Sequence, residues 1–369
     1  MSTERKISPF GEIASFVSGN RPQGGVSQIK EGALSLGGEH VGVDGKLALT
    51  TPKYVPQDYY NANPKGHIYA GDILLCKDGA LSGKVALERG ELSGLQSMVN
   101  EHVFIIRTNK LNQRYLFYYM FSPVGQRLLK GIVTGAAQGG INGKNLKSIP
   151  VVYPESLNEQ QRIVDELDLL TGIIDKKNAQ LRDLDALAQS TFYEMFGDPI
   201  ANDKRWGMKK VIEVVKMQRG FDLPVQDRVS TGRIPVYGSN GIVGMHSQSK
   251  VSEGIITGRS GTIGRVDCCR NPFWPLNTTL FSIDCRGNNV IYLKYLMSNF
   301  HLERFSAGAG VPTLNRNDFH EEPIIDVPLE MQVSFASKVE AIENYKNIIR
   351  QSLTENQLLI DSRMNAYFN

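Results

Sequence analysis

The stretch CKDGALSGKV, residues 76–85, combines glycines and lysines as loops that hold phosphate groups do. It follows the apolar run GDILL, residues 71–75, which is typical of a strand. A Walker-type nucleotide loop requires four residues between its glycines and a Ser or Thr after its lysine, because that hydroxyl binds Mg²⁺. Here three residues separate Gly79 from Gly83, and Val85 follows Lys84. The segment therefore does not fit a nucleotide-binding loop.

A second stretch, GIITGRSGTIGRV at residues 254–266, has the same layout of strand, glycine turn, cation and valine. The shared features predict a β-hairpin with a cation at its tip in both places. The cations are Lys77 and Lys84 in the first copy and Arg259 and Arg265 in the second. Such a side chain can bind a DNA phosphate or a guanine edge. The alternative is an ordinary hairpin with a solvated cation, but the repetition favours the contact.

Other segments repeat in the same order along the chain. FGEIASFVSGNRP (10–22) matches VIEVVKMQRGFDLP (211–224), NEHVFIIR (100–107) matches NTTLFSID (277–284), YLFYYM (115–120) matches YLKYLM (292–297), and INGKNLKSIPVVYP (141–154) matches LNRNDFHEEPIIDVP (314–328). The matching loops add further candidate DNA contacts, namely Asn142, Lys144, Asn315 and Arg316. Arg21 and Arg219 join them because they lie close to the aligned glycines Gly19 and Gly220.

Residues 158–196 contain no proline and a single glycine, and their apolar residues recur at alternating intervals of four and three. This seam predicts a helix with a heptad repeat, roughly 60 Å long. Its apolar positions are Ile163, Leu167, Leu170, Ile174, Leu181 and Leu184, and Lys177 interrupts them. Ser156 and Glu159 fit a capping box at the start of the helix, and Gly197 fits its end.

The C-terminal segment has a second seam of the same phase, in which Phe335 follows Ile163 by 172 residues. Its apolar positions are Phe335, Val339, Ile342, Ile349, Leu353 and Ile360, and its polar positions are Lys346, Asn356 and Arg363. Pro328 suits the first turn of this helix. One such run would indicate an amphipathic helix packed on its own domain. Two of equal length and phase favour an intramolecular antiparallel pair, in which polar seam positions weaken the pair locally or set its register.

The chain is thus expected to alternate lobe, helix, lobe and helix, over residues 1–156, 157–197, 198–327 and 328–369. Each lobe mixes short strands with a few helices, so the fold class is α+β. The arrangement is two similar α/β domains joined by two long antiparallel coiled-coil helices, with a pseudo-two-fold internal repeat. The helical spacing of Tyr115, Tyr118, Tyr292 and Tyr295 places these side chains in the lobe cores.

Composition excludes several other classes of protein. With 41% hydrophobic residues in 369, the chain is not intrinsically disordered. The four cysteines form no C-x-x-C pair and the six histidines are scattered, so no metal site and no cofactor are predicted. No apolar run is close to the length of about 18 residues that a membrane span requires. The first ten residues also lack the apolar core of a signal peptide. A soluble, cytoplasmic protein is expected.

Charge is distributed unevenly. The two predicted helices are acidic, with 4 Lys/Arg against 8 Asp/Glu in residues 158–196 and 4 against 5 in residues 329–369. The lobes are basic, with 17 against 12 in residues 1–157 and 16 against 13 in residues 197–328. This distribution points weakly to a polyanionic partner of the lobes.

An enzyme would need a recognisable site. An adenine methyltransferase requires an Asn/Asp-Pro-Pro-aromatic motif, and NPFW (271–274) lacks the second proline, so its aromatic residues are expected in the core. The glycine-rich stretch TGAAQGGINGKN (134–145) has no Lys-Ser/Thr after it and is interpreted as a loop. No nucleophile–base constellation is evident, and no catalytic role is predicted.

The order of lobes and helices resembles that of the specificity subunit of type I restriction-modification systems. The segments that carry the resemblance are IPVYGSNGIVG (234–244), which leads into GIITGRSGTIGRV, and KSIPVVYPESLNEQQRIVDELDLL (147–170). The resemblance covers nearly the whole chain, and residues 24–66 are its least typical part.

This resemblance implies that each lobe is a target-recognition domain and each long helix a spacer. The lobes would read the two halves of a split, asymmetric site in double-stranded DNA. The subunit would bind two modification (methyltransferase) subunits, and restriction (motor-nuclease) subunits would join the full complex. It would itself have no catalytic role. The alternative is a coiled-coil scaffold whose lobes bind proteins without reading DNA.

Overall fold

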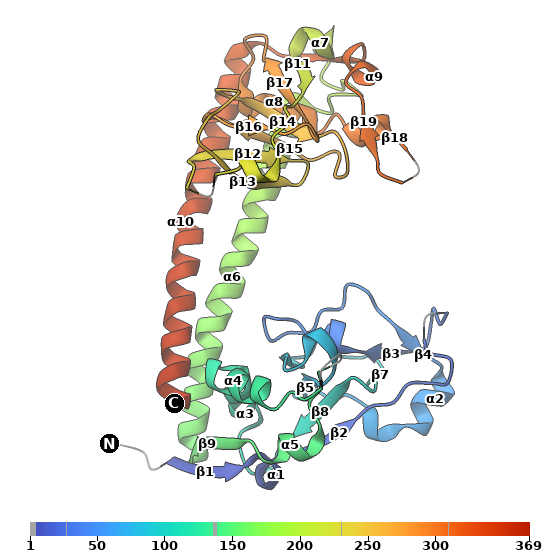
Figure 1. Ribbon diagram of the computed structural model, residues 1–369, viewed down its shortest axis with the longest axis vertical. Coiled ribbons are helices and arrows are strands. Elements are labelled where there is room, and N and C mark those ends of the chain that lie inside the picture. Colours follow the sequence, from blue (N-terminus) through green and yellow to red (C-terminus); the bar gives the residue numbers. More distant parts are fainter. Residues whose placement is uncertain (1–4, 27, 136–138, 230, 309) are drawn as a thin grey trace. The chain divides into compact units, whose positions relative to one another are not determined.

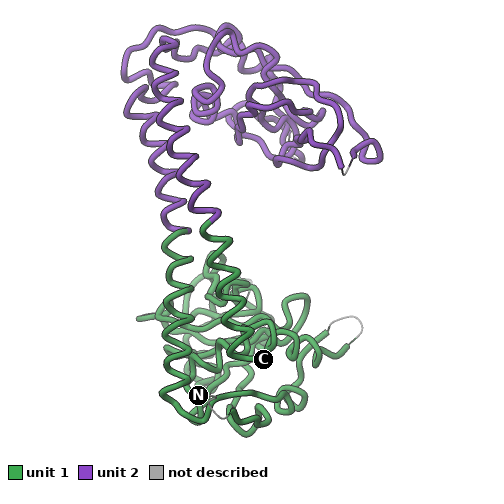
Figure 2. The backbone as a smooth tube through the Cα atoms, turned by 90° about the vertical axis from the view of Figure 1, so that its left-hand side faces the viewer, with its two compact units in different colours: residues 1–177, 352–369 green, residues 178–351 purple. Residues whose placement is uncertain are grey.

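The computed structural model describes residues 5–26, 28–135, 139–229, 231–308 and 310–369 (Figure 1). The chain divides into two compact units (Figure 2). Unit 1 comprises residues 1–177 and 352–369, and unit 2 comprises residues 178–351. Two long helices, α6 (Leu157–Phe196) and α10 (Leu329–Phe368), contribute a segment to each unit. Each unit therefore contains one lobe and part of both helices.

Unit 1 has a four-stranded antiparallel sheet in the order β2-β8-β5-β6, a three-stranded sheet β4-β3-β7, and the pair β1-β9. Its strands are β1 (Arg5–Pro9), β2 (Ser15–Ser18), β3 (Ala33–Leu36), β4 (Tyr54–Val55), β5 (Ile73–Cys76), β6 (Val85–Leu87), β7 (Ser97–Val99), β8 (Val103–Arg107) and β9 (Pro150–Pro154). Its shorter helices are α1 (Phe10–Ile13), α2 (Gln57–Ala62), α3 (Gln113–Phe121), α4 (Pro123–Gly131) and α5 (Gly143–Lys147), with 3-10 turns η1 (Gly38–His40), η2 (Pro64–Gly66) and η3 (Gly79–Leu81).

Unit 2 has a four-stranded sheet β11-β17-β14-β15, a three-stranded sheet β13-β12-β16, and the pairs β10-β20 and β18-β19. Its strands are β10 (Gly207–Lys210), β11 (Lys216–Arg219), β12 (Ile234–Gly238), β13 (Gly241–His246), β14 (Gly254–Gly258), β15 (Val266–Cys269), β16 (Trp274–Pro275), β17 (Thr279–Asp284), β18 (Ser306–Ala307), β19 (Thr313–Leu314) and β20 (Pro323–Asp326). Its shorter helices are α7 (Val211–Val214), α8 (Val290–Ser298) and α9 (Asn317–His320), with 3-10 turns η4 (Val225–Asp227) and η5 (Leu302–Phe305).

The two units share a strand order. In each four-stranded sheet a strand near the centre, β8 or β17, pairs antiparallel with two neighbours. In each three-stranded sheet the middle strand has one parallel partner, β7 for β3 and β16 for β12. The segments that repeat in the sequence lie on corresponding elements. Residues 100–107 and 277–284 contain β8 and β17, and residues 115–120 and 292–297 lie in α3 and α8.

The aromatic residues of α3 and α8 form the lobe cores, as the sequence predicts. Tyr115 and Tyr118 are fully buried, and Tyr292 and Tyr295 are buried as well. The Tyr118 hydroxyl donates a hydrogen bond to Oδ1 of Asp168 in α6, at 2.6 Å. Burial raises the pKa of Tyr295 to about 12. The Tyr295 hydroxyl therefore stays protonated at neutral pH.

The ends of the long helices differ in detail from the sequence prediction. Ser156 Oγ accepts a hydrogen bond from the Glu159 N–H at 3.4 Å. The Glu159 carboxylate binds Arg162 at 2.8 and 2.9 Å, so an ion pair takes the place of the return contact of the predicted capping box. Gly197 ends α6 with a φ of 74°, as expected of a C′ glycine. Pro328 stands before the first turn of α10, and its carbonyl accepts from the Met331 N–H at 3.0 Å.

In unit 1 the start of α6 packs against the end of α10. Their shared core with the lobe contains Ile163, Val164, Leu167, Ile360, Met364 and Phe368. Arg363 is an exposed seam residue, and its Nε binds Oε1 of Glu166 at 2.9 Å. Lys177 donates a hydrogen bond to Ser352. Because low residue numbers in α6 meet high ones in α10, the two segments of unit 1 run antiparallel.

In unit 2 the end of α6 packs against the start of α10 in the same sense. Their shared core with the lobe contains Ala188, Phe192, Phe196, Phe335, Ala336 and Val339. The Phe335 ring lies 5.7 Å from the Phe192 ring and 5.4 Å from the Phe196 ring, measured between centroids. The predicted seam thus continues directly into the core of the lobe.

Lys346 is a polar seam residue of α10 in unit 2 and is only 5% exposed. Its Nζ lies 2.6 Å from Asp185 Oδ1 and 2.6 Å from Glu343 Oε1. Burial acts to lower the pKa of Lys346, but the hydrogen bonds to Asp185 and Glu343 raise it above its ordinary value. The ammonium group is therefore charged and doubly paired.

The two paired carboxylates offset the free-energy cost of burying the charge of Lys346 in the seam. We expect the double change Asp185→Asn and Glu343→Gln to lower the free energy of unfolding of unit 2 by about 1–2 kcal/mol, because both carboxylates reach solvent. Lys346→Met should be nearly neutral, since an apolar chain fills the same space. Both tryptophans, Trp206 and Trp274, lie in unit 2, so tryptophan fluorescence during urea unfolding reports this unit. An equal loss in both variants would contradict the explanation.

Candidate nucleic-acid interface

The predicted hairpins are present in both units. β5 pairs antiparallel with β6, and β14 with β15. Lys77 directly follows β5 and Lys84 directly precedes β6. Arg259 and Arg265 take the same places after β14 and before β15. The expectation of a cation at the tip is wrong in this detail, because the cations bracket the loop and the turn between them is formed by other residues.

The same backbone hydrogen bonds connect each hairpin to two other loops. The Ile141 N–H donates to the Lys77 carbonyl at 2.7 Å, and the Leu314 N–H donates to the Arg259 carbonyl at 2.8 Å. These bonds bring the loops that begin at Asn142 and Asn315 next to the hairpins. We call residues 76–84, 100–102 and 139–144 loop cluster 1, and residues 258–265, 276–279 and 312–316 loop cluster 2.

The third loop of each cluster precedes β8 or β17. The Lys77 N–H donates to the His102 carbonyl at 2.9 Å, and the Arg259 N–H donates to the Thr278 carbonyl at 2.8 Å. The aligned glycines Gly19 and Gly220 approach the backbone that leads to this loop. A Cβ atom at Gly19 would overlap the Val99 carbonyl, far inside van der Waals contact, and one at Gly220 would overlap the Leu276 carbonyl. Only glycine fits there.

The two predicted asparagines have local roles in the backbone. Asn142 Oδ1 accepts from the Asn145 N–H at 2.8 Å and so caps α5. Asn315 Oδ1 accepts from the Asn317 N–H at 3.1 Å, just before α9. Lys144 is exposed in the first turn of α5, and Arg316 is half-buried beside Asn315. The structure thus places all four residues at the clusters, and gives Asn142 a capping function that the sequence did not indicate.

Several of the predicted cations have carboxylate partners within their own unit. Arg21 Nε lies 2.9 Å from Glu101 Oε1. Arg265 Nε lies 3.0 Å from Asp267 Oδ2, and the Arg219 guanidinium lies 3.6 Å from Asp222. Such exposed pairs are weak and exchange readily with other anions.

The remaining hairpin cations are different. Lys77 Nζ lies 4.9 Å from the centre of the Phe104 ring, so its charge rests on an aromatic face. Lys84 and Arg259 are half-buried, and neither forms an ion pair with any residue that the structure describes. These two side chains are the most available for an external anion.

The structure adds residues that the sequence analysis did not select. Ser239 and Asn240 form the turn between β12 and β13. A Cβ atom at Gly261 would lie 3.5 Å from Ser239 Oγ, so this turn packs against loop cluster 2. In unit 1, Glu39 occupies the corresponding place after β3 and lines a cavity of 270 Å³ together with Asp78 and His102. The signal was present, because Ser239 and Asn240 lie inside IPVYGSNGIVG.

His320 connects α9 to the sheet of unit 2. It is 5% exposed, and its Nε2 accepts a hydrogen bond from the Met217 N–H at 3.1 Å. Burial lowers the pKa of His320, and the nearby charge of Arg316 lowers it further. Accepting a hydrogen bond requires Nε2 to be unprotonated, so the neutral ring is the form that stabilises the fold.

This lowered pKa predicts a pH dependence of stability. Below the ordinary histidine pKa of about 6.5, the unfolded chain binds a proton that the folded His320 resists. The stabilisation is therefore complete above that pH and is lost as the pH falls through the folded pKa. We expect the melting temperature of unit 2 to fall less steeply from pH 7 to pH 5 in His320→Gln than in the unchanged protein. Parallel pH profiles of the tryptophan-detected melting temperature would contradict this.

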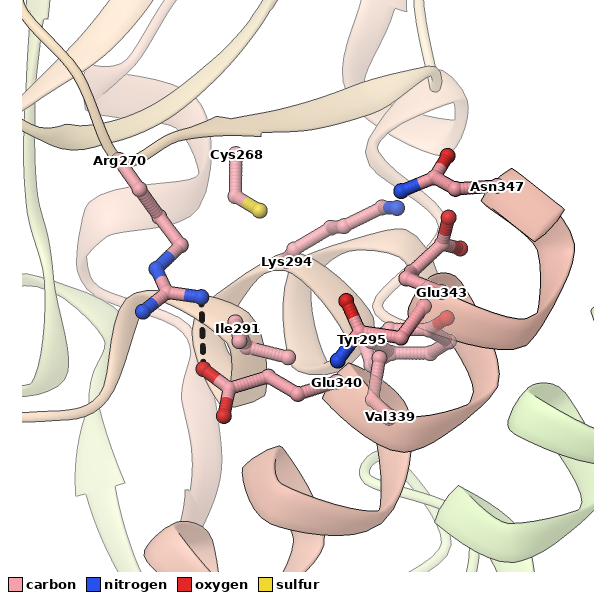
Figure 3. Close-up of a pocket in the computed structure, with 10 residues that line it drawn as sticks. Cys268, Arg270, Ile291, Lys294, Tyr295, Val339, Glu340, Glu343 and Asn347 are labelled. Atoms are coloured by element: carbon pink, nitrogen blue, oxygen red, sulfur yellow. Dashed lines mark ion pairs between the residues drawn. The ribbon is translucent and has the colours of Figure 1, made fainter. Parts of the chain in front are cut away.

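A cavity of 440 Å³ lies in unit 2 between β15, α8 and α10 (Figure 3). Cys268, Arg270, Lys294 and Tyr295 are among its lining residues, and Arg270 binds Glu340 at 2.6 Å. Burial raises the pKa of the Cys268 thiol, which keeps it protonated and a poor nucleophile. None of the described residues that line this cavity is a histidine.

The aromatic residues of NPFW are in the core, as predicted, with Phe273 fully buried and Trp274 7% exposed. Part of the glycine-rich stretch 134–145 lies outside the described residues. Over the described ranges, no three His, Cys, Asp or Glu side chains gather as metal ligands would. None of the helices seen in those ranges combines the length and the apolar character that a bilayer span requires.

Comparison with known proteins identifies part of the chain. Residues 21–183 match the family model described as Type I restriction modification DNA specificity domain. These residues, less than half of the chain, are similar to that domain. The match covers the lobe of unit 1 from residue 21 onward and α6 as far as residue 183, and it includes the whole of loop cluster 1. The predicted resemblance to type I specificity subunits is confirmed.

A curated relative of this specificity domain is the "Type I restriction enzyme MjaVIII specificity subunit" of Methanocaldococcus jannaschii. It is 26% identical over 141 residues, which are 37% of this chain and 32% of the relative. The matched stretch thus spans about a third of that relative's length.

Two solved structures have a similar fold along the whole chain. The type I restriction-modification S subunit from M. genitalium has a TM-score of 0.59 at 14% identity, covering 100% of this chain and 97% of its own. A chain from a study of complex assembly and conformational transition of the type I R-M system has a TM-score of 0.57 at 16% identity, covering 99% and 97%. Both support a mixed α/β fold for the chain.

Proposed function

We propose that this protein is the DNA-recognition subunit of a type I restriction-modification complex, and that it reads a bipartite, asymmetric site in double-stranded DNA. Each loop cluster would contact one half of the site. The observation that carries the proposal is that equivalent backbone hydrogen bonds at Lys77 and Arg259 assemble the same loops in both units. Different side chains on the same framework would give half-sites of different sequence.

The chemistry of the clusters supports binding to DNA. Cations bind phosphates, and their contacts with base edges provide sequence specificity. Lys84, Lys144, Arg259, Arg265 and Arg316 lie at the clusters, on lobes with an excess of Lys and Arg. Arg21 and Arg219 lie beside them and would reach DNA by exchanging their carboxylate partners for phosphates.

We further propose that α6 and α10 act as an antiparallel coiled-coil spacer between two target-recognition domains related by a pseudo-two-fold repeat. The functional division would be residues 1–156, 157–197, 198–327 and 328–369. Exposed apolar side chains on these helices support a role in binding other subunits. They include Leu169, Leu187, Tyr345, Ile348, Leu358 and Leu359.

The partners would be two modification (methyltransferase) subunits, with restriction (motor-nuclease) subunits in the full complex. Those subunits would supply all of the chemistry, and this chain would be non-catalytic. The second candidate is a coiled-coil scaffold without DNA readout, which the exposed apolar residues of α6 and α10 would also fit.

A mobility-shift assay distinguishes the two candidates. The chain is purified with its methyltransferase partner and titrated onto a duplex that contains the site found by methylome sequencing, and onto a random-sequence duplex. A DNA reader binds the first duplex in preference and loses affinity as salt increases. Failure to bind either duplex at low salt would favour the scaffold.

The hairpin cations provide a sharper test. We expect Lys84→Ala to weaken binding of the complex to its site by about 1 kcal/mol or more, and Arg265→Ala by less, because Arg265 is already paired with Asp267. Assembly with the methyltransferase should not change. Matched controls are Lys110→Ala, beyond the far end of β8, and Arg270→Ala, at the other end of β15 and paired with Glu340. If the hairpin variants bind like their controls, these hairpins do not contact DNA.

A further inference from the structure

Arg259 differs from Arg265 and Arg219 in its electrostatic surroundings. Its guanidinium forms no ion pair or hydrogen bond with any residue in the ranges that the structure describes. Arg265, in contrast, has Asp267 at 3.0 Å, and Arg219 has Asp222 at 3.6 Å. Those two side chains must exchange a carboxylate before they can bind DNA. Arg259 offers all of its donors directly.

The backbone of Arg259 is also unusually well fixed for a loop residue. Its N–H donates to the Thr278 carbonyl at 2.8 Å, and its carbonyl accepts from the Leu314 N–H at 2.8 Å. The preceding Gly258 ends β14, and the Thr262 carbonyl fills the space where its side chain would be. Arg259 as a whole is half-buried. The backbone position from which the Arg259 side chain extends is therefore fixed by β14, β19 and the loop before β17.

A fixed backbone position is more important for a side chain that reads a base than for one that binds a phosphate. Base readout depends on the alignment of two hydrogen bonds, whereas a phosphate presents charge in many directions. The planar fork of a guanidinium matches O6 and N7 of guanine in the major groove, and this is the commonest specific contact between proteins and DNA.

The equivalent position of unit 1 has the same framework but a different end group. Lys77 makes the corresponding bonds to His102 and Ile141, at 2.9 and 2.7 Å. Its Nζ rests on the Phe104 ring, 4.9 Å from the centroid. A single ammonium held on an aromatic face cannot form the two parallel hydrogen bonds that a guanidinium forms. At this position the lobe of unit 2 thus carries a guanidinium and the lobe of unit 1 an ammonium.

We propose that Arg259 is a specificity-determining residue, which binds O6 and N7 of one guanine in the half-site contacted by unit 2. This inference rests on the proposed function and adds to it the identity of one base. It separates Arg259 from Lys84 of unit 1, whose single ammonium group suits a phosphate contact.

The test uses the chain assembled with its methyltransferase partner and a duplex that contains the site mapped by methylome sequencing. Each guanine of the site is replaced in turn by 7-deazaguanine, which pairs normally but lacks the N7 acceptor. Competition binding is measured for the unchanged complex, for Arg259→Lys and for Arg259→Ala, with Arg265→Lys as the matched control from the same loop.

We expect one replacement to weaken the unchanged complex by about tenfold. Both Arg259 variants should bind the natural site about tenfold more weakly and should lose their sensitivity to that replacement. The Arg265→Lys complex should keep it. Arg259→Lys retains the charge and most of the stem, so it answers the question even if Arg259→Ala fails to fold.

Two results would overturn the inference. One is that the Arg259 variants remain sensitive to every replacement that affects the unchanged complex. The other is that they lose affinity equally for the mapped site and for random-sequence DNA, with a smaller salt dependence, which indicates a phosphate contact. A different result, in which the unchanged complex does not distinguish its mapped site from random DNA, would refute the proposed function itself.

Discussion

Phe335→Ala is expected to lower the free energy of unfolding of unit 2 by about 3–5 kcal/mol. Phe335 is fully buried where α10 meets the lobe. Its ring centroid lies 5.2 Å from that of Tyr295 and 5.4 Å from that of Phe196. Removing the ring leaves a cavity between α6 and α8, whose Phe196 and Tyr295 rings lose a packing partner. A loss of this size is a large fraction of the stability of a typical domain.

Urea unfolding followed by tryptophan fluorescence measures the effect, since Trp206 packs on Phe196 with ring centroids 6.5 Å apart. The matched control is Tyr345→Ala, an aromatic truncation on the same helix at a side chain that is 55% exposed. It should cost about 0.5 kcal/mol or less. Similar losses in both variants would mean that the junction of α10 with the lobe contributes little to stability.

Gly258→Ala is expected to disable loop cluster 2. A Cβ atom at Gly258 would overlap the Thr262 carbonyl oxygen, and backbone cannot move aside as a flexible side chain can. The loop that carries Arg259 and Arg265 must then change its conformation, at a cost of about 1–3 kcal/mol. Since several contacts would be displaced together, we expect specific DNA binding by the complex to fall by about 100-fold.

The control is Gly287→Ala, beyond the opposite end of β17. Gly287 has a φ of 76°, but no atom lies within 4 Å of the added Cβ. It should therefore cost about 1 kcal/mol of stability, from the backbone alone, and leave DNA binding unchanged. Specific binding that survives in Gly258→Ala would show that loop cluster 2 is not the reading surface.

The periodic part of the fold could be predicted because burial repeats with the helix. Ile163, Leu167, Val339 and Ile360 recur at heptad spacing, and all four are buried. The aromatic cores of α3 and α8 followed from the same reasoning. The ends of the helices were less predictable. The Glu159 carboxylate can bind either the Ser156 backbone N–H or the Arg162 side chain, and the spacing in the sequence does not indicate which partner is preferred.

The candidate interface could be predicted only in part. The glycine and cation pattern located both hairpins, yet it placed their cations at the tip, since the strand ends at Cys76 and Gly258 have no marker in the sequence. The convergence of the loops depends on hydrogen bonds between residues far apart in the chain, such as Ile141 and Lys77. Ser239 lies inside the segment IPVYGSNGIVG, but its contact with Gly261 of another hairpin has no marker in the sequence.

Unit 1 is assembled from both ends of the sequence, and this has a consequence for its synthesis. Ile360, Met364 and Phe368 complete a core that otherwise consists of residues up to 177. While the ribosome is still making unit 2, the first lobe exposes the apolar side chains that will later receive these three. The core of unit 1 is therefore complete only after residues 360–368 have been synthesised. A chain truncated before Ile360 would lack three of the side chains that fill this core.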